Sequence, residues 1–201
     1  MTARTIAVVT AGLSQPSSTR LLADRLAEAT RAALGPDAAV EVIELRDIAV
    51  DITNNLLTGF PGPKLKEAVD TVTHADGLIA VTPVFTASYS GLFKSFFDVL
   101  DKEALDGKPV VVAATGGTER HSLVLDFALR PLFAYLRANV AATGVYAASS
   151  DWGSGDAQGA LQRRVARAAD ELAALVKAAP QQRHTDELTS LPFEQLLADL
   201  D

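Results

Sequence analysis

Residues 77–100 read GLIAVTPVFTASYSGLFKSFFDVL, and this segment decides the fold. It opens with GLIAVT, an almost wholly apolar run that is typical of a strand buried on both faces of a parallel sheet. It closes with apolar side chains at helical spacing, namely Leu92, Phe93, Phe96, Phe97 and Leu100. The segment therefore predicts a strand, a loop and a helix in succession, which is the repeating unit of α/β proteins.

The same alternation continues in both directions along the chain. We expect further strands at residues 5–10, 40–45, 109–115 and 140–148, and further helices at residues 18–34, 64–74, 122–137 and 158–178. Residues 51–63 are rich in Asn, Gly and Pro and predict a loop, whereas Pro131 predicts a kink or bulge in its helix. Five strands alternating with helices predict an α/β, flavodoxin-like three-layer sandwich with a five-stranded parallel sheet in the order 2-1-3-4-5.

Composition excludes several functional classes. The chain has 201 residues, 48% of them hydrophobic, which suits one globular domain. It has no cysteine, which excludes a disulfide scaffold, a zinc–thiolate site, an iron–sulfur cluster and a cysteine nucleophile. The net charge of −7 argues against nucleic-acid binding, because such affinity depends on neutralising phosphates.

The acidity is concentrated at one end of the chain. Residues 180–201 hold Arg183 against five carboxylates, a net charge of 1 − 5 = −4. We expect a flavodoxin-like domain over residues 1–179, followed by an acidic linker and a short C-terminal helix at residues 192–200. Residues 1–10 lack a signal-peptide pattern and no apolar stretch is long enough to span a bilayer, so we expect a cytoplasmic protein without a membrane partner.

The loop after the first strand carries an unusual number of hydroxyl groups. Residues 11–20 read AGLSQPSSTR and lead directly into a predicted helix. Backbone N–H groups and the helix dipole make a helix N-terminus an anion site, and hydroxyls can donate to phosphate oxygens. Helix capping by Ser and Thr is the alternative explanation. The loop fits neither the Walker A pattern nor the dinucleotide G-x-G-x-x-G pattern.

Two more loops follow the next two central strands. In residues 82–90, Pro83 pins the chain and Phe85 or Tyr89 offers a flat ring for stacking, although ordinary strand–helix loops have a similar composition. In residues 114–121, ATGGTERH, two glycines allow bare amides to face a ligand, a tight turn being the alternative. Because the carboxyl ends of parallel strands share one edge of the sheet, the three loops are expected to flank one crevice that suits a mononucleotide with a planar head.

The runs TPVFTASYSGLFKSFFDVL (82–100), ATGGTERH (114–121) and VLDFALRPLFAYL (124–136) resemble the NADPH-dependent FMN reductases of the flavodoxin-like superfamily. The likeness covers about residues 5–178 and is strongest to the reductases of two-component, luciferase-like or alkanesulfonate-type monooxygenase systems. It implies an oxidoreductase that transfers a hydride from NADPH or NADH to FMN, with the cofactor carrying the reaction and no catalytic side chain. The three histidines are scattered along a chain without cysteine, so no metal site is expected. The resemblance also implies a homodimer or homotetramer and a flavin-dependent monooxygenase as partner.

The resemblance further implies roles for individual residues of the three loops. The FMN phosphate would be held by Ser14, Ser17, Ser18 and Thr19. The isoalloxazine ring would be lined by Pro83, Val84, Phe85 and Thr86. Its pyrimidine edge would be contacted by Thr115, Gly116 and Gly117, which leave the other face open for nicotinamide. Many relatives have Gly-Ser-x-Arg in the first loop, where this chain has residues 12–15, GLSQ, so only Arg20 is expected near enough to help hold the phosphate.

Two rival functions stay open at this point. One is an FMN-dependent quinone or azo reductase that holds its FMN tightly. The other is a non-enzymatic, flavodoxin-like electron carrier. The serine-rich first loop and the open ring face favour a reductase over the electron carrier. The sequence leaves open the choice between the two reductases and that between NADPH and NADH.

Overall fold

The computed structural model describes residues 4–153 and 156–180. The strands are β1 (Thr5–Thr10), β2 (Ala39–Glu44), β3 (Gly77–Phe85), β4 (Ser88–Tyr89), β5 (Pro109–Gly116), β6 (Asn139–Val140) and β7 (Val145–Ala148). The α-helices are α1 (Ser18–Leu34), α2 (Ala49–Thr58), α3 (Pro63–His74), α4 (Gly91–Asp98), α5 (Arg130–Tyr135) and α6 (Asp156–Ala178). The short 3₁₀ and π turns are η1 (Leu45–Ile48), η2 (Glu119–His121), η3 (Leu125–Leu129) and η4 (Ser149–Trp152). The expected helix at residues 192–200, with nearly all of the acidic linker before it, lies outside the described residues.

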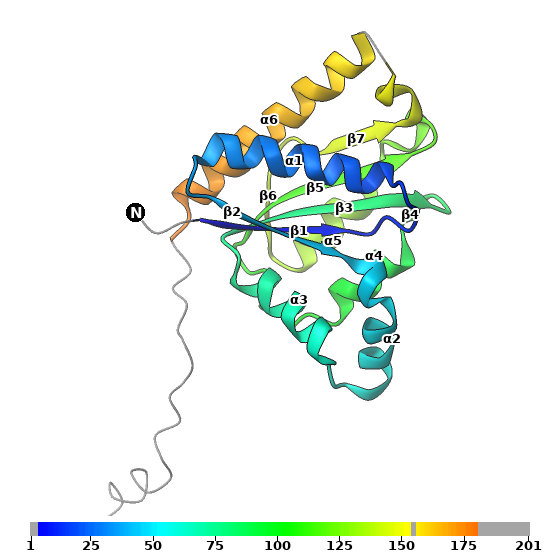
Figure 1. The fold of residues 1–201 in the computed structure, drawn as a ribbon, viewed down its shortest axis with the longest axis vertical. Helices are drawn as coiled ribbons and strands as arrows, with labels where there is room; N and C mark the ends of the chain where they lie inside the picture. The colour runs from blue at the N-terminus through cyan, green and yellow to red at the C-terminus, as the bar shows by residue number, and fades with distance from the viewer. Residues whose placement is uncertain (1–3, 154–155, 181–201) are drawn as a thin grey trace, which may run out of the picture.

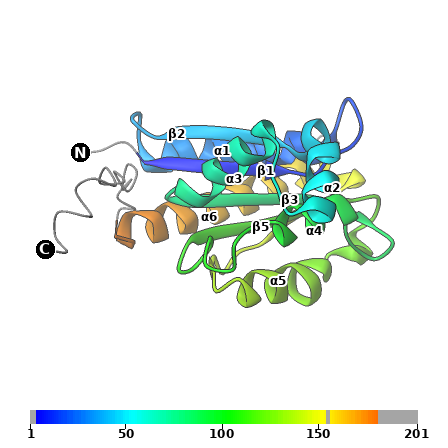
Figure 2. The same ribbon diagram turned by 90° about the horizontal axis from the view of Figure 1, so that it is seen from below.

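These elements form three layers, with the sheet in the middle (Figure 1). Helices α1 and α6 cover one face, and α2, α3, α4 and α5 lie on the other (Figure 2). The sheet order is β2-β1-β3-β5-β6, with β4 beside β3 and β7 beside β5. All strand pairs are parallel except the β3–β4 hairpin. The predicted α/β, flavodoxin-like architecture is confirmed.

The strand count differs from the prediction, because the described residues form seven strands and not five. The expected strand at residues 140–148 is divided into β6 and β7, which pair with successive parts of β5. Between them, the Glu171 carboxylate accepts hydrogen bonds from the backbone N–H of Thr143 at 2.6 Å and from its hydroxyl at 2.7 Å. That N–H therefore bonds to a helix side chain and not to the neighbouring strand, which interrupts the ladder.

The predicted loop at residues 51–63 is wrong in its first part, because residues 49–58 form α2. Ile48 and Ile52 lie one helical turn apart and both are buried in the core, so burial outweighs the low helix propensity of Asn54 and Asn55. The helix ends at Gly59, whose φ of 77° lies in the left-handed region that glycine enters without strain.

The predicted irregularity near Pro131 is confirmed. The wide π turn η3 precedes α5, and Pro131 lies in the first turn of that helix. The Arg130 N–H bonds back to the Leu125 carbonyl in the wide π pattern, so the regular α-helical bonding is already altered directly before the residue that has no N–H to donate.

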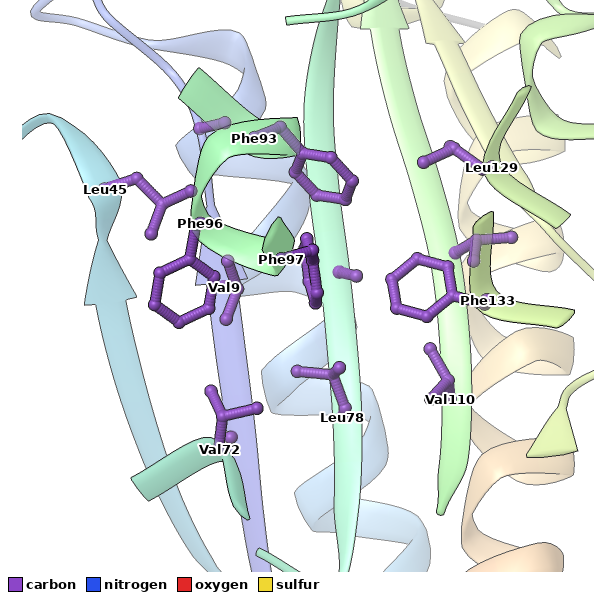
Figure 3. Packing of buried hydrophobic residues seen from close by; sticks show 14 of the residues in the cluster. Val9, Leu45, Val72, Leu78, Phe93, Phe96, Phe97, Val110, Leu129 and Phe133 are labelled. Atoms are coloured by element: carbon purple, nitrogen blue, oxygen red, sulfur yellow. The ribbon is translucent and has the colours of Figure 1, made fainter. Parts of the chain in front are cut away.

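The core has two parts, one on each face of the sheet. Alternate residues of β3 point to opposite faces, so Leu78 packs with the α2–α5 layer while Ile79 packs with α1 and α6. Figure 3 shows the aromatic side chains on the first of these faces. The ring centroid of Phe97 lies 4.7 Å from that of Phe93 and 5.0 Å from that of Phe133. The expected core positions in residues 90–100 are thus confirmed for Phe93, Phe96 and Phe97, which are at most 2% exposed.

Lys108 is a charged residue at the end of the sheet opposite the three loops. Its side chain is 2% exposed, and its Nζ donates to the carbonyl oxygens of Thr73, at 3.1 Å, and of Ala75. It thereby serves carbonyl groups at the end of α3 that the helix itself leaves unpaired. Burial lowers the pKa of Lys108 to about 8, although Asp76 acts in the opposite direction.

This lowered pKa predicts a pH-dependent contribution to stability. Above about pH 8 the folded protein releases the Lys108 proton, whereas the unfolded chain keeps it up to the ordinary pKa of about 10.5. The unfolded state then binds more protons, so the free energy of unfolding should rise with pH between these values. Urea denaturation of wild type and Lys108→Met at pH 7.5, 8.5 and 9.5 measures this: the wild-type value should rise relative to the variant's. The exposed Lys66→Met should keep the wild-type slope, and parallel profiles for wild type and Lys108→Met would contradict the assignment.

Candidate functional site

Strands β1, β3 and β5 end at one edge of the sheet, on the right in Figure 1. Their register aligns the ends, because Thr10 pairs with Val81 and Pro83 pairs with Thr115. The segments at these strand ends, at residues 11–19 (the first loop), 83–90 (the second loop) and 115–118 (the third loop), therefore lie side by side. The expected common edge is present in the structure.

The first loop combines exposed hydroxyls with a helix N-terminus. Ser14 and Ser18 are exposed, and Ser17 is partly buried. The Ser17 hydroxyl accepts a hydrogen bond from the backbone N–H of Arg20 at 3.2 Å, so this residue does cap α1. An oxygen that accepts this bond still has its proton to donate, and the other amides of the first turn have no partner within the helix. The loop can therefore offer several donors to an anion.

Thr19 connects the first and third loops. Its hydroxyl lies 2.8 Å from that of Thr115, and the two residues are 2% and 3% exposed. The bond joins the start of α1 to the end of β5, across residues that are 96 apart in the chain. Because each hydroxyl is engaged with the other, a direct bond from the Thr19 side chain to a phosphate stays a prediction.

The second loop is a tight hairpin. Val84 and Phe85 pair with Tyr89 and Ser88, and the turn between them consists of Thr86 and Ala87, with φ of 48° and 67°. Holding residues with a Cβ in this left-handed region costs about 1–2 kcal/mol each. Such strain persists only where surrounding contacts enforce the conformation, and it often marks a functional segment.

Thr82 supplies one of those contacts, because its buried hydroxyl accepts from the backbone N–H of Ser90 at 3.0 Å. The hydroxyl itself donates to the carbonyl of Pro83 at 2.9 Å. Phe85, beyond this anchored base, is 46% exposed. The hairpin therefore presents an accessible ring and bare backbone at the edge of the sheet.

The third loop is held by a hydrogen bond from Tyr146, which lies on the neighbouring strand β7. The Tyr146 hydroxyl donates to the carbonyl oxygen of Thr118 at 2.7 Å, and a Cβ added to Gly116 would lie 2.1 Å from that hydroxyl oxygen. Burial, with Asp151 and Glu119 nearby, raises the pKa of Tyr146, so the hydroxyl keeps the proton that it donates. Gly116 is thus needed for close approach, whereas Gly117 is exposed with open space around its Cα.

Two arginines lie beside the first loop. Arg20 pairs with Asp24 at 2.7 Å and with Glu44, and its hydrogen bond to Asp24 is the main cause that raises its pKa. Arg46, in the η1 turn that follows β2, donates to the carbonyl oxygen of Ser14 at 3.1 Å. Arg46 is thus a second arginine beside this loop, which the sequence did not indicate, whereas the expectation that Arg20 helps to hold the phosphate stays a prediction.

Arg46 and Tyr146 both belong to no motif, and their contacts join segments far apart in the chain. The only local hint for Arg46 is its place in the turn after a strand.

Among residues 4–153 and 156–180, no group of three or more His, Asp or Glu side chains is arranged to hold a metal ion. In the same residues, no helix has both the length and the apolar character to cross a bilayer.

Comparison with known proteins gives a consistent result. Residues 4–153 match the family model described as NADPH-dependent FMN reductase. A curated relative named FMN reductase (NADPH), from Pseudomonas aeruginosa, is 41% identical over 149 residues, which are 73% of this chain and 78% of the relative. A NADH-dependent FMN reductase, SfnF, from Pseudomonas putida is 38% identical over 142 residues, 71% of this chain and 76% of its own.

Solved structures of similar proteins have the same fold. An oxidoreductase from Corynebacterium diphtheriae superposes with a TM-score of 0.86 at 49% identity, covering 90% of this chain and 100% of that one. The apo form of the NADH:FMN oxidoreductase EmoB superposes with a TM-score of 0.75 at 30% identity, covering 90% and 95%.

The close contact below the third loop predicts that its two glycines respond differently to substitution. Gly116→Ala places a methyl group against the Tyr146 hydroxyl and should destabilise the protein by about 1–3 kcal/mol. Gly117→Ala has open space and is the matched control, with an expected change within about 0.5 kcal/mol. Urea denaturation measures both. Part of the Gly116→Ala loss should disappear in a Tyr146→Phe background, and equal costs at the two glycines would contradict the proposed contact.

Proposed function

The chain belongs to the NADPH-dependent FMN reductase family and is an NAD(P)H-dependent FMN reductase; from this premise we propose that FMN binds at the carboxyl edge of the sheet, between the three loops. The observation that carries this placement is the buried Thr19–Thr115 hydrogen bond, at 2.8 Å between the hydroxyl oxygens. It holds the hydroxyl-rich start of α1 and the glycine loop after β5 together at one edge. A phosphate site and a flat-ring site at these two loops would then be parts of a single crevice.

The residues at this edge fit FMN. Ser14, Ser17 and Ser18, with the amides at the start of α1 and of Thr19, would hold the phosphate. Pro83, Val84, Phe85 and Thr86 would line the isoalloxazine ring from the β3–β4 hairpin. Thr115, Gly116 and Gly117 would meet its pyrimidine edge. None of these groups needs a side-chain charge, so the acidity of the chain does not oppose the binding of a phosphorylated ligand.

The protein's own task in the reaction is alignment. Bound FMN supplies the hydride acceptor, and a nicotinamide ring of NADPH or NADH supplies the hydride. The β3–β4 hairpin and the glycine loop would orient the flavin. The exposed Gly117, which has no side chain, would leave space for the nicotinamide at the open face of the flavin ring. A transfer between two stacked rings needs no acid or base from the protein, so no side chain at this edge is assigned a catalytic role.

The activity assay that tests this proposal is NADPH and NADH oxidation by the purified full chain, with and without added FMN. We expect oxidation that depends on added FMN, because the flavin is bound in an open crevice and leaves after reduction. An added FMN-dependent luciferase should then emit light, which would support transfer of reduced FMN to a partner monooxygenase. Quinone turnover by yellow protein without added FMN would support the quinone reductase instead. If the protein oxidises neither NADPH nor NADH under any of these conditions, the result would support the non-enzymatic electron carrier.

We further infer a cytoplasmic homodimer or homotetramer. Large apolar side chains stand exposed on the chain, notably Phe60 at 80%, Phe127 at 78% and Tyr135 at 74%. Exposed aromatic side chains of this kind are enriched at protein interfaces. Sedimentation equilibrium of the full chain should give two or four times the mass of 21.1 kDa, whereas a monomer at micromolar concentration would contradict the inference.

A further inference from the structure

Arg46 reaches the first loop from a different part of the chain. It lies in η1, directly after the edge strand β2, and is 32 residues from Ser14 in sequence. Its Nη1 donates to the Ser14 carbonyl at 3.1 Å. The Gln15 amide, with its oxygen turned to the guanidinium, accepts from Nη2 at 2.6 Å and from Nη1 at 3.1 Å. Nη2 also pairs with Glu44 at 2.7 Å.

These contacts engage both terminal nitrogens of Arg46, with Ser14 and Gln15 on the loop side and Glu44 on the other. Its side chain is 18% exposed, and Glu44 at 19% holds it from the other side. The structural effect of Arg46 is on the loop itself, which it ties to the end of β2 through one backbone and one side-chain acceptor.

The tie also determines how the loop's peptide groups point. In a trans peptide the carbonyl and the next N–H point in opposite directions. Because the Ser14 carbonyl is turned toward Arg46, the Gln15 N–H points away from it, and the carbonyl oxygen is not available to repel an anion on the other side. The guanidinium also places a positive charge next to a loop that has no basic residue between Ala11 and Thr19.

Arg20, the other cation nearby, is engaged differently. Its guanidinium pairs with Asp24 on its own helix and with Glu44. Its backbone N–H bonds to the Ser17 hydroxyl, but among the described residues its side chain forms no hydrogen bond or ion pair with the first loop. Glu44 thus holds both arginines, but only Arg46 extends from it to the loop.

We propose that Arg46 is a positioning residue that makes the first loop selective for a phosphorylated flavin over the same flavin without phosphate. This rests on the proposed function, in which that loop receives the FMN phosphate. Hydroxyls and amides bind phosphate well only when several of them converge on one point. The Arg46 tie holds the exposed Ser14–Gln15 segment in one conformation, so that this convergence does not have to be achieved during binding.

The test compares FMN with riboflavin, which carries the same ring without the phosphate. Dissociation constants for both are measured by flavin fluorescence titration of the full chain, without NADPH. For Arg46→Gln we expect FMN affinity to fall about tenfold, or about 1.4 kcal/mol, while riboflavin affinity stays within about twofold. Arg46→Lys keeps the charge without the two-pronged geometry and should lose part of the FMN affinity. Arg31→Gln, at the other end of α1, is the matched control and should leave both constants unchanged.

The possible outcomes separate the proposal from its premise. Equal losses of FMN and riboflavin affinity, or no loss of either, would overturn the role of Arg46 in phosphate selection. If wild type binds riboflavin as tightly as FMN, the placement of the phosphate in the first loop fails as well. Thermal unfolding of each variant accompanies the titrations. Should Arg46→Gln prove unstable, Gln15→Ala removes two of the same hydrogen bonds from the loop side. It should likewise lower the affinity for FMN and leave the affinity for riboflavin unchanged.

Discussion

Burial of the sheet on both faces is the constraint on which the rest of this structure depends. The central strands β3 and β5 are buried almost to their last residues, so their side chains pack against the helices on both faces of the sheet. Polar side chains are then largely excluded from the two faces of the sheet and lie at the ends of the strands. Because the main strands are parallel, their carboxyl ends gather at one edge, and the three loops with unusual composition all begin there.

Each of these loops is held by a side chain that belongs to another part of the structure. Arg46, after the neighbouring edge strand, ties the first loop. Thr82, inside β3, holds the base of the second, and Tyr146, on β7, holds the third. The Thr19–Thr115 bond then joins the first loop to the third. Three loops made largely of backbone and small hydroxyls, with the exposed ring of Phe85, are thereby held in defined positions at one edge of the sheet.

The helices and strands were predictable where local pattern and tertiary burial agree. Helix α1 lies at residues 18–34 as expected, because its apolar spacing and the glycine after it carry the information locally. Helix α2 was missed because its Asn-rich sequence argues against a helix, and only the burial of Ile52 overrides that preference. The division of the last strand was missed for a similar reason, since it depends on the Glu171 carboxylate from a helix 28 residues later. At the site, the positions of the loops followed from strand order, whereas the roles of single residues toward FMN stay predictions.

The sequence by itself determined the alternation of strands and helices, the order of the sheet, the common edge at which the three loops lie and the family likeness of the loops. These are properties of apolar periodicity and of short motifs, which are local in the chain. Only the tertiary structure decided that Thr19 faces Thr115, that Tyr146 supports the glycine loop, and that Arg46 rather than Arg20 is tied to the first loop. Those contacts join residues between 28 and 96 positions apart, so they arise from the packing of the strands and leave no local pattern in the sequence.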